Sequence, residues 1–119
     1  MVRVRYADVK PYTTKDGSLI RELMHPSLHG NSKQSLAEAT IPAGFTTFLH
    51  RHRLSEEIYY ILQGEGLMRV EDDTFKVTEG DTIYIPPGAA HQIRNVGEGP
   101  LRILCCCSPP YSHQDTELL

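Results

Sequence analysis

The chain has 119 residues, with 12 lysines and arginines against 15 aspartates and glutamates. This length suits one domain with one core, and the balanced charge without a basic block argues against nucleic acid as a partner. No apolar run reaches membrane length and the N-terminal segment lacks the apolar core of a signal peptide, so we expect no membrane contact. The three adjacent cysteines, Cys105 to Cys107, read as reduced thiols, so we expect a cytoplasmic location.

Strand signals are dense along the chain and helical signals are scarce. Residues 2–9 mix β-branched and aromatic side chains, residues 18–24 read as a strand, and residues 27–34 read as a polar loop. Further short strands are expected at 35–41, 46–51, 57–62, 67–71, 74–77, 82–85, 91–95 and 101–107. Glycine, proline and aspartate separate them, and this pattern favours an antiparallel sandwich or barrel. The tail, residues 108–119, has no clear element: it either ends disordered or folds Tyr111 and His113 over a barrel mouth.

The segment 57–62 is apolar on both faces. Side chains alternate across a strand, so Tyr59 and Ile61 share one face while Ile58, Tyr60 and Leu62 share the other. Both faces must then be covered, whereas a small barrel hides only its interior. We therefore expect the N-terminal strands or a second subunit on the outer face, and predict a homodimer.

Three histidines and a glutamate have the chemistry of a metal-ligand set. His50 and His52 are two residues apart and so point to one face of a strand, Glu57 opens the next strand, and His91 comes from a distant one. Neutral imidazole with carboxylate suits divalent Mn, Fe, Co, Ni, Cu or Zn. The pair of histidines alone is a weak signal, and Glu56 competes with Glu57.

The spacing of the whole pattern resembles the two signature motifs of the cupin family. The first motif is matched by Gly44, His50, His52, Glu57 and Gly64, and the second by Gly80, Pro86, Gly88, His91 and Asn95. The resemblance covers residues 36–107 well and residues 1–35 more loosely.

A small single-domain cupin is an all-β protein, so the resemblance implies a jelly-roll β-barrel of two antiparallel sheets. Residues 36–107 would form its core, residues 1–35 would add strands and a loop packed on the barrel, and residues 108–119 would be the tail. The resemblance also implies one divalent metal ion held by His50, His52, Glu57 and His91, and it selects Glu57 over Glu56. Asn95 is expected to brace a strand or loop.

Five further residues are candidates for the site, each with a structural alternative. Tyr59 either donates a hydrogen bond to an oxygen ligand of the ion or fills the core. Arg21 or His25 could hold an anionic group or move protons at the barrel mouth. The alternative for each is a place on the surface. Glu38 is either a second carboxylate in the pocket or an edge residue facing water. Cys105 is either a small buried hydrophobe or a thiol lining the pocket.

Three kinds of function follow from an ion with two open positions. The first is isomerisation of a sugar or sugar phosphate, as in the phosphomannose-isomerase-like cupins that this sequence resembles. The ion would stabilise an enediolate while Glu38, His25 or Tyr59 moves a proton. The second is dioxygenase or oxalate-type decarboxylase chemistry. The third is a module that binds a small ligand without catalysis.

Overall fold

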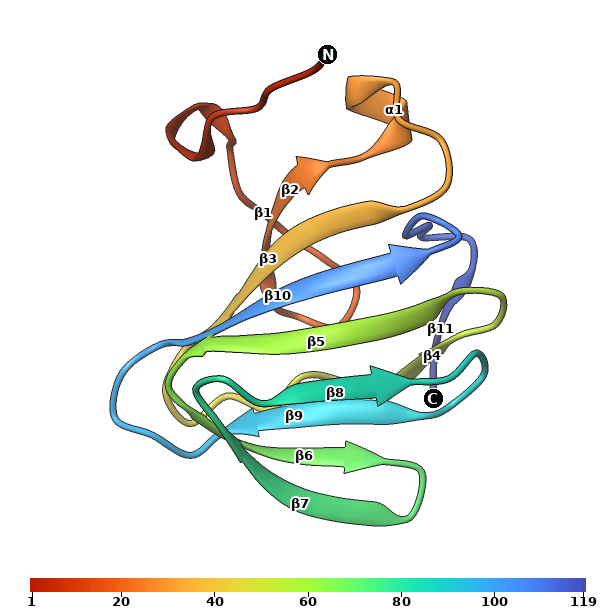
Figure 1. Ribbon diagram of the computed structural model, residues 1–119. Coiled ribbons are helices and arrows are strands. Elements are labelled where there is room, and N and C mark those ends of the chain that lie inside the picture. Colours follow the sequence, from red (N-terminus) through yellow and green to blue (C-terminus); the bar gives the residue numbers. More distant parts are fainter.

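Two antiparallel sheets pack against each other in the computed structural model, which describes residues 1–119. The first sheet contains, in spatial order, β1 (Tyr12–Thr13), β2 (Leu19–Met24), β3 (Ser35–Ile41), β10 (Leu101–Ser108), β5 (Glu56–Gln63) and β8 (Thr82–Ile85) (Figure 1). The second contains β11 (Thr116–Leu118), β4 (His50–His52), β9 (His91–Asn95), β6 (Glu65–Val70) and β7 (Asp73–Thr78). The prediction of an all-β fold with two antiparallel sheets is confirmed.

The core lies between the sheets and follows the alternation of side chains along each strand. In β5 the residues Glu57, Tyr59 and Ile61 are buried, while Ile58 and Tyr60 are exposed. The largest fully buried apolar side chains come from both sheets: Ile41, Ile61, Met68, Ile85, Ile93, Leu101 and Ile103. Asn95 closes one end of this core, because its amide donates to the carbonyl oxygens of Ile41 and Gly99, both at 2.8 Å. This is the bracing role expected for it.

The N-terminal part differs from the prediction in two places. Residues 2–9 contain a 3₁₀ turn, η1 (Tyr6–Asp8), and no strand. The expected polar loop begins with a one-turn helix, α1 (Pro26–His29), in which Pro26 occupies the first turn and Gly30 ends the helix at φ 81°. Both are short local turns, which a reading based on strand periodicity does not detect. No helix of this fold has the length and apolar character needed to cross a membrane.

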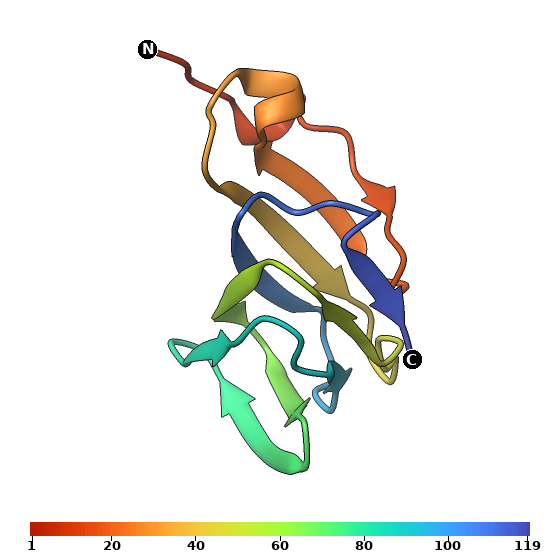
Figure 2. The ribbon, with the colours of Figure 1, turned by 90° about the vertical axis from the view of Figure 1, so that its right-hand side faces the viewer.

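The C-terminal tail is ordered, which corrects the expectation of a disordered end. Residues Thr116–Leu118 form β11 and extend the second sheet, with Thr116 opposite His52 and Leu118 opposite His50. In Figure 2 this blue segment runs down to the C-terminus on the side of the molecule. The tail reaches this place because Asp115 accepts hydrogen bonds from the backbone N–H groups of Leu54 and Ser55.

The outer face of β5 stays apolar and uncovered within one chain. Ile58, Tyr60 and the neighbouring Tyr84 are 41%, 42% and 55% exposed. The N-terminal strands do not lie over this face, because β2 pairs edge to edge with β3 in the same sheet. That alternative is therefore wrong, and a second copy of the chain remains our prediction for this surface.

Candidate metal centre

Three buried histidines meet between β4 and β9. His50 and His52 share a face of β4, and His91 lies directly opposite His50 in the antiparallel register. They are 3%, 5% and 0% exposed, and one ring nitrogen of each lies within 4.8 Å of the other two. The sheet thus brings together the histidines that the sequence separates by up to 41 positions.

The hydrogen bonds of the three rings leave the same nitrogen free in each. The Nδ1 atoms of His50 and His91 donate to the backbone oxygens of Phe48 and Ala89, at 2.8 and 2.9 Å. A carbonyl oxygen can only accept, so Nδ1 carries the hydrogen and the neutral ring offers a lone pair at Nε2. Nε2 of His91 is buried without a hydrogen-bond partner. Such an orphaned nitrogen fits a metal ligand, since metal-binding histidines are oriented through their other ring nitrogen.

The third ring is oriented by the tail. The Nδ1 atom of His52 lies 2.9 Å from Oγ1 of Thr116, whose hydroxyl donates to the carbonyl oxygen of Ser112 at 2.8 Å. Because that hydroxyl hydrogen is already used, Oγ1 accepts from Nδ1–H of His52, and Nε2 keeps its lone pair. One residue outside the histidine strands therefore fixes the tautomer of His52.

Glu57 lies beside the three histidines. Its Oε1 atom lies 3.2 Å from Nε2 of His52 and 3.4 Å from Nε2 of His91. Two adjacent ligands of one ion, each bonded at about 2.1 Å and at right angles, lie about 3.0 Å apart, so these separations fit a shared first-row ion. Glu56 is exposed and accepts a hydrogen bond from Tyr84 instead. The structure brings Glu57, and not Glu56, to the histidines.

The electrostatics of the centre suit a cation. Burial and the neighbouring His91 lower the pKa of His50 to about 4, so His50 is neutral near pH 7. Burial alone would raise the pKa of Glu57, but the adjacent imidazoles of His52 and His91 hold it below its ordinary value. Glu57 is thus a carboxylate facing bare imidazole nitrogens, an arrangement that a divalent ion between them stabilises.

A cavity opens from the centre along the inner face of the first sheet. Its walls come from β1, β2, β3, β4, β5, β10 and the C-terminal tail. It is narrow: the space open to the centre of a water-sized molecule is about 40 Å³. Tyr59 and Cys105 line it, as the sequence indicated, and so does Cys107, whose thiol donates to Oε2 of Glu57 at 3.2 Å.

Three of the predicted site residues lie outside this cavity. On β2 the side chains of Ile20 and Glu22 face it, so Arg21 between them faces outward. His25 caps α1, and its Nε2 lies 2.8 Å from the backbone oxygen of Tyr111, away from the ion ligands.

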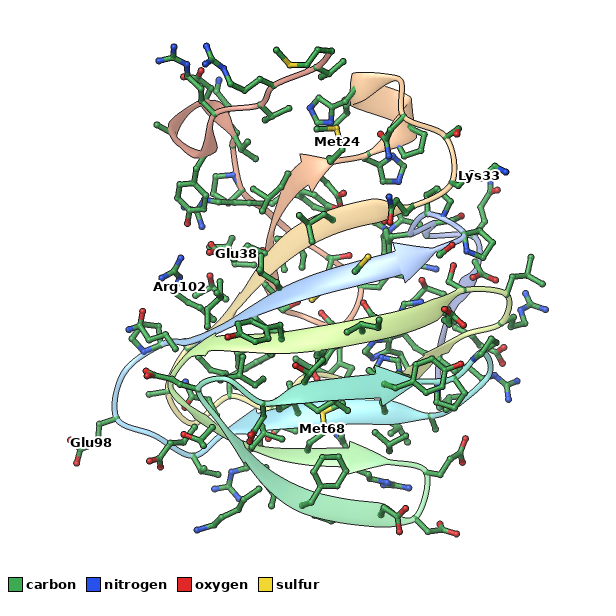
Figure 3. All side chains as sticks on the ribbon, in the orientation of Figure 1. Met24, Lys33, Glu38, Met68, Glu98 and Arg102 are labelled. Atoms are coloured by element: carbon green, nitrogen blue, oxygen red, sulfur yellow. The ribbon has the colours of Figure 1, made fainter.

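Glu38 is buried on the outer face of β3, which rules out its expected place in the pocket. Its neighbours Ala37 and Ala39 line the cavity, so alternation turns Glu38 away. It accepts hydrogen bonds from the hydroxyl of Tyr6, at 2.6 Å, and from the guanidinium of Arg102. Figure 3 shows Glu38 and Arg102 side by side on β3 and β10.

Asp16 is a site residue that the sequence reading missed. It lies in the turn before β2, where Oδ1 accepts hydrogen bonds from the N–H (2.9 Å) and the hydroxyl (2.6 Å) of Ser18. Oδ2 lies 3.8 Å from Nε2 of His50 and lines the cavity. The segment Asp-Gly-Ser indicates only a turn, and nothing local reveals that this turn is folded against the histidines.

Comparisons with known proteins agree with this geometry. The model of the cupin domain matches residues 37–107. An uncharacterised protein of Methanocaldococcus jannaschii is 58% identical over 100% of this chain and 95% of its own length. The crystal structure of a predicted oxalate decarboxylase of Thermotoga maritima has a TM-score of 0.77 at 28% identity, over 92% of this chain and 99% of that one.

The polyketide cyclase RemF of Streptomyces resistomycificus is a further solved structure with the same fold. Its TM-score is 0.79 at 26% identity, over 91% of this chain and 79% of that one. None of these relatives fixes a substrate for this chain, and a phosphomannose-isomerase subgroup is not among what they support. The domain match, the two sheets and the histidine centre agree on the family: the chain is a small single-domain member of the cupin family.

Proposed function

We propose that the protein is a divalent-metal-dependent enzyme that moves a proton next to a carbonyl group of a small oxygen-rich metabolite. Isomerisation of a sugar or sugar phosphate is the reaction that we place first. The observation that carries this proposal is the second carboxylate, Asp16, beside the candidate metal centre. Proton transfer needs a group of this kind, whereas binding of the ion does not.

The ion would be held by His50, His52, His91 and Glu57. When bound it would supply a Lewis acid that polarises a carbonyl oxygen of the substrate. The residues of the protein would then orient the substrate in the narrow cavity and move the proton of the carbon next to its carbonyl group.

Asp16 is suited to the second task. Two hydrogen bonds from Ser18 fix Oδ1, so Oδ2 stays free and turned toward the centre. Oδ2 would accept the proton of the carbon next to the carbonyl and return it to the neighbouring carbon, while a hydroxyl proton passes between the two oxygens. Aldose and ketose then interconvert without net oxidation.

Tyr59 and the thiols have supporting tasks. Burial, followed by the charge of Glu57, raises the pKa of the Tyr59 hydroxyl well above its usual value, so it stays protonated and can donate to a substrate oxygen. Burial and Glu57 likewise raise the pKa of the thiols of Cys105 and Cys107. Protonated thiols are poor nucleophiles, which favours a role as small wall residues over covalent catalysis.

The second candidate is decarboxylation or oxygenation of an oxalate-like substrate. The likeness to the predicted oxalate decarboxylase of Thermotoga maritima supports it, and a 1,2-dicarboxylate offers two adjacent oxygens to one ion. Binding of such a ligand without turnover is the third possibility that we retain.

Deuterium exchange separates these functions. Metal-loaded protein is incubated without oxygen in D₂O with a panel of aldoses and ketoses, and proton NMR follows the carbon next to the carbonyl. We expect exchange and interconversion, and an at least hundredfold loss of rate in Asp16→Asn, since a general base contributes about 10²–10⁴-fold. The metal content of Asp16→Asn should stay unchanged. Turnover of oxalate, or activity that requires oxygen, would overturn the proposal; binding without any exchange would favour the third possibility.

A further inference from the structure

A thiol contacts the oxygen of Glu57 that does not face the histidines. Oε1 of Glu57 lies 3.2 Å from Nε2 of His52 and 3.4 Å from Nε2 of His91. Oε2 lies 3.2 Å from Sγ of Cys107. An ionised carboxylate can only accept hydrogen bonds, so the S–H group of Cys107 donates to Oε2. The two oxygens of Glu57 are thus directed apart, one toward the histidines of β4 and β9 and one toward β10.

The pairing of β10 with β5 brings this thiol to Glu57 (Figure 1). Cys107 lies directly opposite Glu57 in the antiparallel register, and residues opposite each other on two strands point to the same face. Both side chains are buried in the structure. The contact therefore belongs to the sheet itself and does not depend on a loop.

Cys105 provides a comparison within the same strand. It precedes Cys107 by two positions, so it shares the same face of β10, and it is buried and lines the same cavity. It pairs with Tyr59, and its thiol is directed to the backbone oxygen of Ile103 at 4.0 Å. A role in filling the cavity wall would explain both cysteines equally. The contact with Glu57 is what distinguishes Cys107.

Removal of the thiol would leave Oε2 of Glu57 without this donor. A buried carboxylate oxygen that lacks a hydrogen bond carries a free-energy cost, because it has also lost its contact with water. The carboxylate can reduce that cost by rotating, and rotation moves Oε1 away from the histidine nitrogens. An ion would then meet a carboxylate that is no longer oriented for it.

We propose that Cys107 is a positioning residue of the metal centre: its thiol keeps Glu57 turned so that Oε1 faces an ion held by the three histidines. Glu57 would then occupy a single position of the ion and leave the open positions to oxygen atoms of a substrate. The inference rests on the metal binding of the proposed function, and it is independent of the reaction that follows.

Metal affinity measures this role. The dissociation constant for Mn²⁺ is obtained with reduced protein from the electron paramagnetic resonance signal of free Mn²⁺. Cys107→Ala should weaken binding about 10–100-fold, which is the loss expected when a group that orients a metal ligand is removed. Cys107→Ser keeps a donor and should bring the affinity back to within about threefold of the wild type. The matched control Cys105→Ala removes a thiol of the same size and should change the affinity less than about twofold.

Two further measurements separate positioning from other roles of the thiol. Cys107→Val fills the place of the thiol without a donor, and it should bind Mn²⁺ as weakly as Cys107→Ala; urea unfolding of the metal-free variants checks that each one folds. The Co²⁺-loaded wild type should lack the near-ultraviolet charge-transfer band of a thiolate bound to cobalt, because that band would mean that Cys107 binds the ion itself.

Five results would each overturn the inference. They are a thiolate–cobalt band, no Mn²⁺ binding by the wild type, near wild-type affinity in Cys107→Ala, no recovery in Cys107→Ser, and an equal loss of affinity in Cys105→Ala. Because affinity is read without turnover, the role of Cys107 can hold or fail independently of the deuterium exchange that tests the reaction.

Discussion

Thr116→Val tests whether the C-terminal tail tunes the candidate metal centre. Valine keeps the β-branched shape of threonine and its fit in a strand, but it cannot accept the hydrogen bond from Nδ1 of His52. The buried Nδ1–H of His52 then lacks a partner. The ring gains by moving its hydrogen to Nε2, where the carboxylate of Glu57 lies 3.2 Å away and can accept it. That tautomer has no lone pair to offer an ion at Nε2.

The expected size of the effect follows from this single lost orientation. Removing a partner that orients a metal-bound histidine costs about 10–100-fold in metal affinity. This corresponds to about 1.4–2.8 kcal/mol of binding free energy. The other two rings keep their own acceptors, so the site should weaken and not disappear.

Competition with a chromophoric chelator measures the dissociation constant for Zn²⁺ or Mn²⁺ in wild type and variant. Thr82→Val is the control, because Thr82 is an exposed threonine in β8 of the other sheet. Urea unfolding of the metal-free proteins checks that Thr116→Val still folds. Affinities of Thr116→Val and wild type within twofold of each other would refute the idea that Thr116 sets the tautomer of His52.

Two further predictions concern the metal itself and the oligomer. Elemental analysis should find a first-row divalent metal in the purified wild type, and the double variant His50→Ala/His91→Ala should lose it. The variant removes two histidines that face each other across β4 and β9. Full metal content in the double variant would disprove the assignment. Light scattering of the wild type at micromolar concentration should give twice the chain mass of 13.4 kDa. Tyr60→Glu should give a monomer, because a charge on the exposed apolar face of β5 cannot be buried in an interface without cost. A monomeric wild type would rule out the dimer.

The strands of the barrel could be predicted because their signals are local. Alternation marks β5 within a few residues, and glycine and proline mark its ends. His50, His52 and Glu57 lie within eight positions, but only their match to the cupin motifs, together with His91, selected them as a candidate ligand set. The alternation and the turn residues are each written in a short stretch of sequence.

Asp16, Glu22 and Thr116 could not be predicted, because their place depends on pairings between distant segments. Thr116 reaches His52 only when the tail adds a strand to β4, 64 positions away. Glu38 shows a different difficulty. Its side chain is 2% exposed, as a pocket residue would be, but it is buried under the N-terminal segment on the outer face. Alternation tells which residues share a face, and it does not tell which face is the inside.

The two ends of the cavity have different origins in the chain. The residues of the candidate metal centre belong to the stretch that the cupin domain model describes, residues 37–107. Asp16 and Glu22 precede that stretch, and Thr116 follows it. The residues of the candidate metal centre can thus stay the same in related proteins while the flanking segments change. Such changes would alter which molecules the cavity binds. The match to the cupin domain model therefore places the chain in a family without indicating its substrate. The substrate is better sought by comparing the segments before residue 37 and after residue 107 among related proteins.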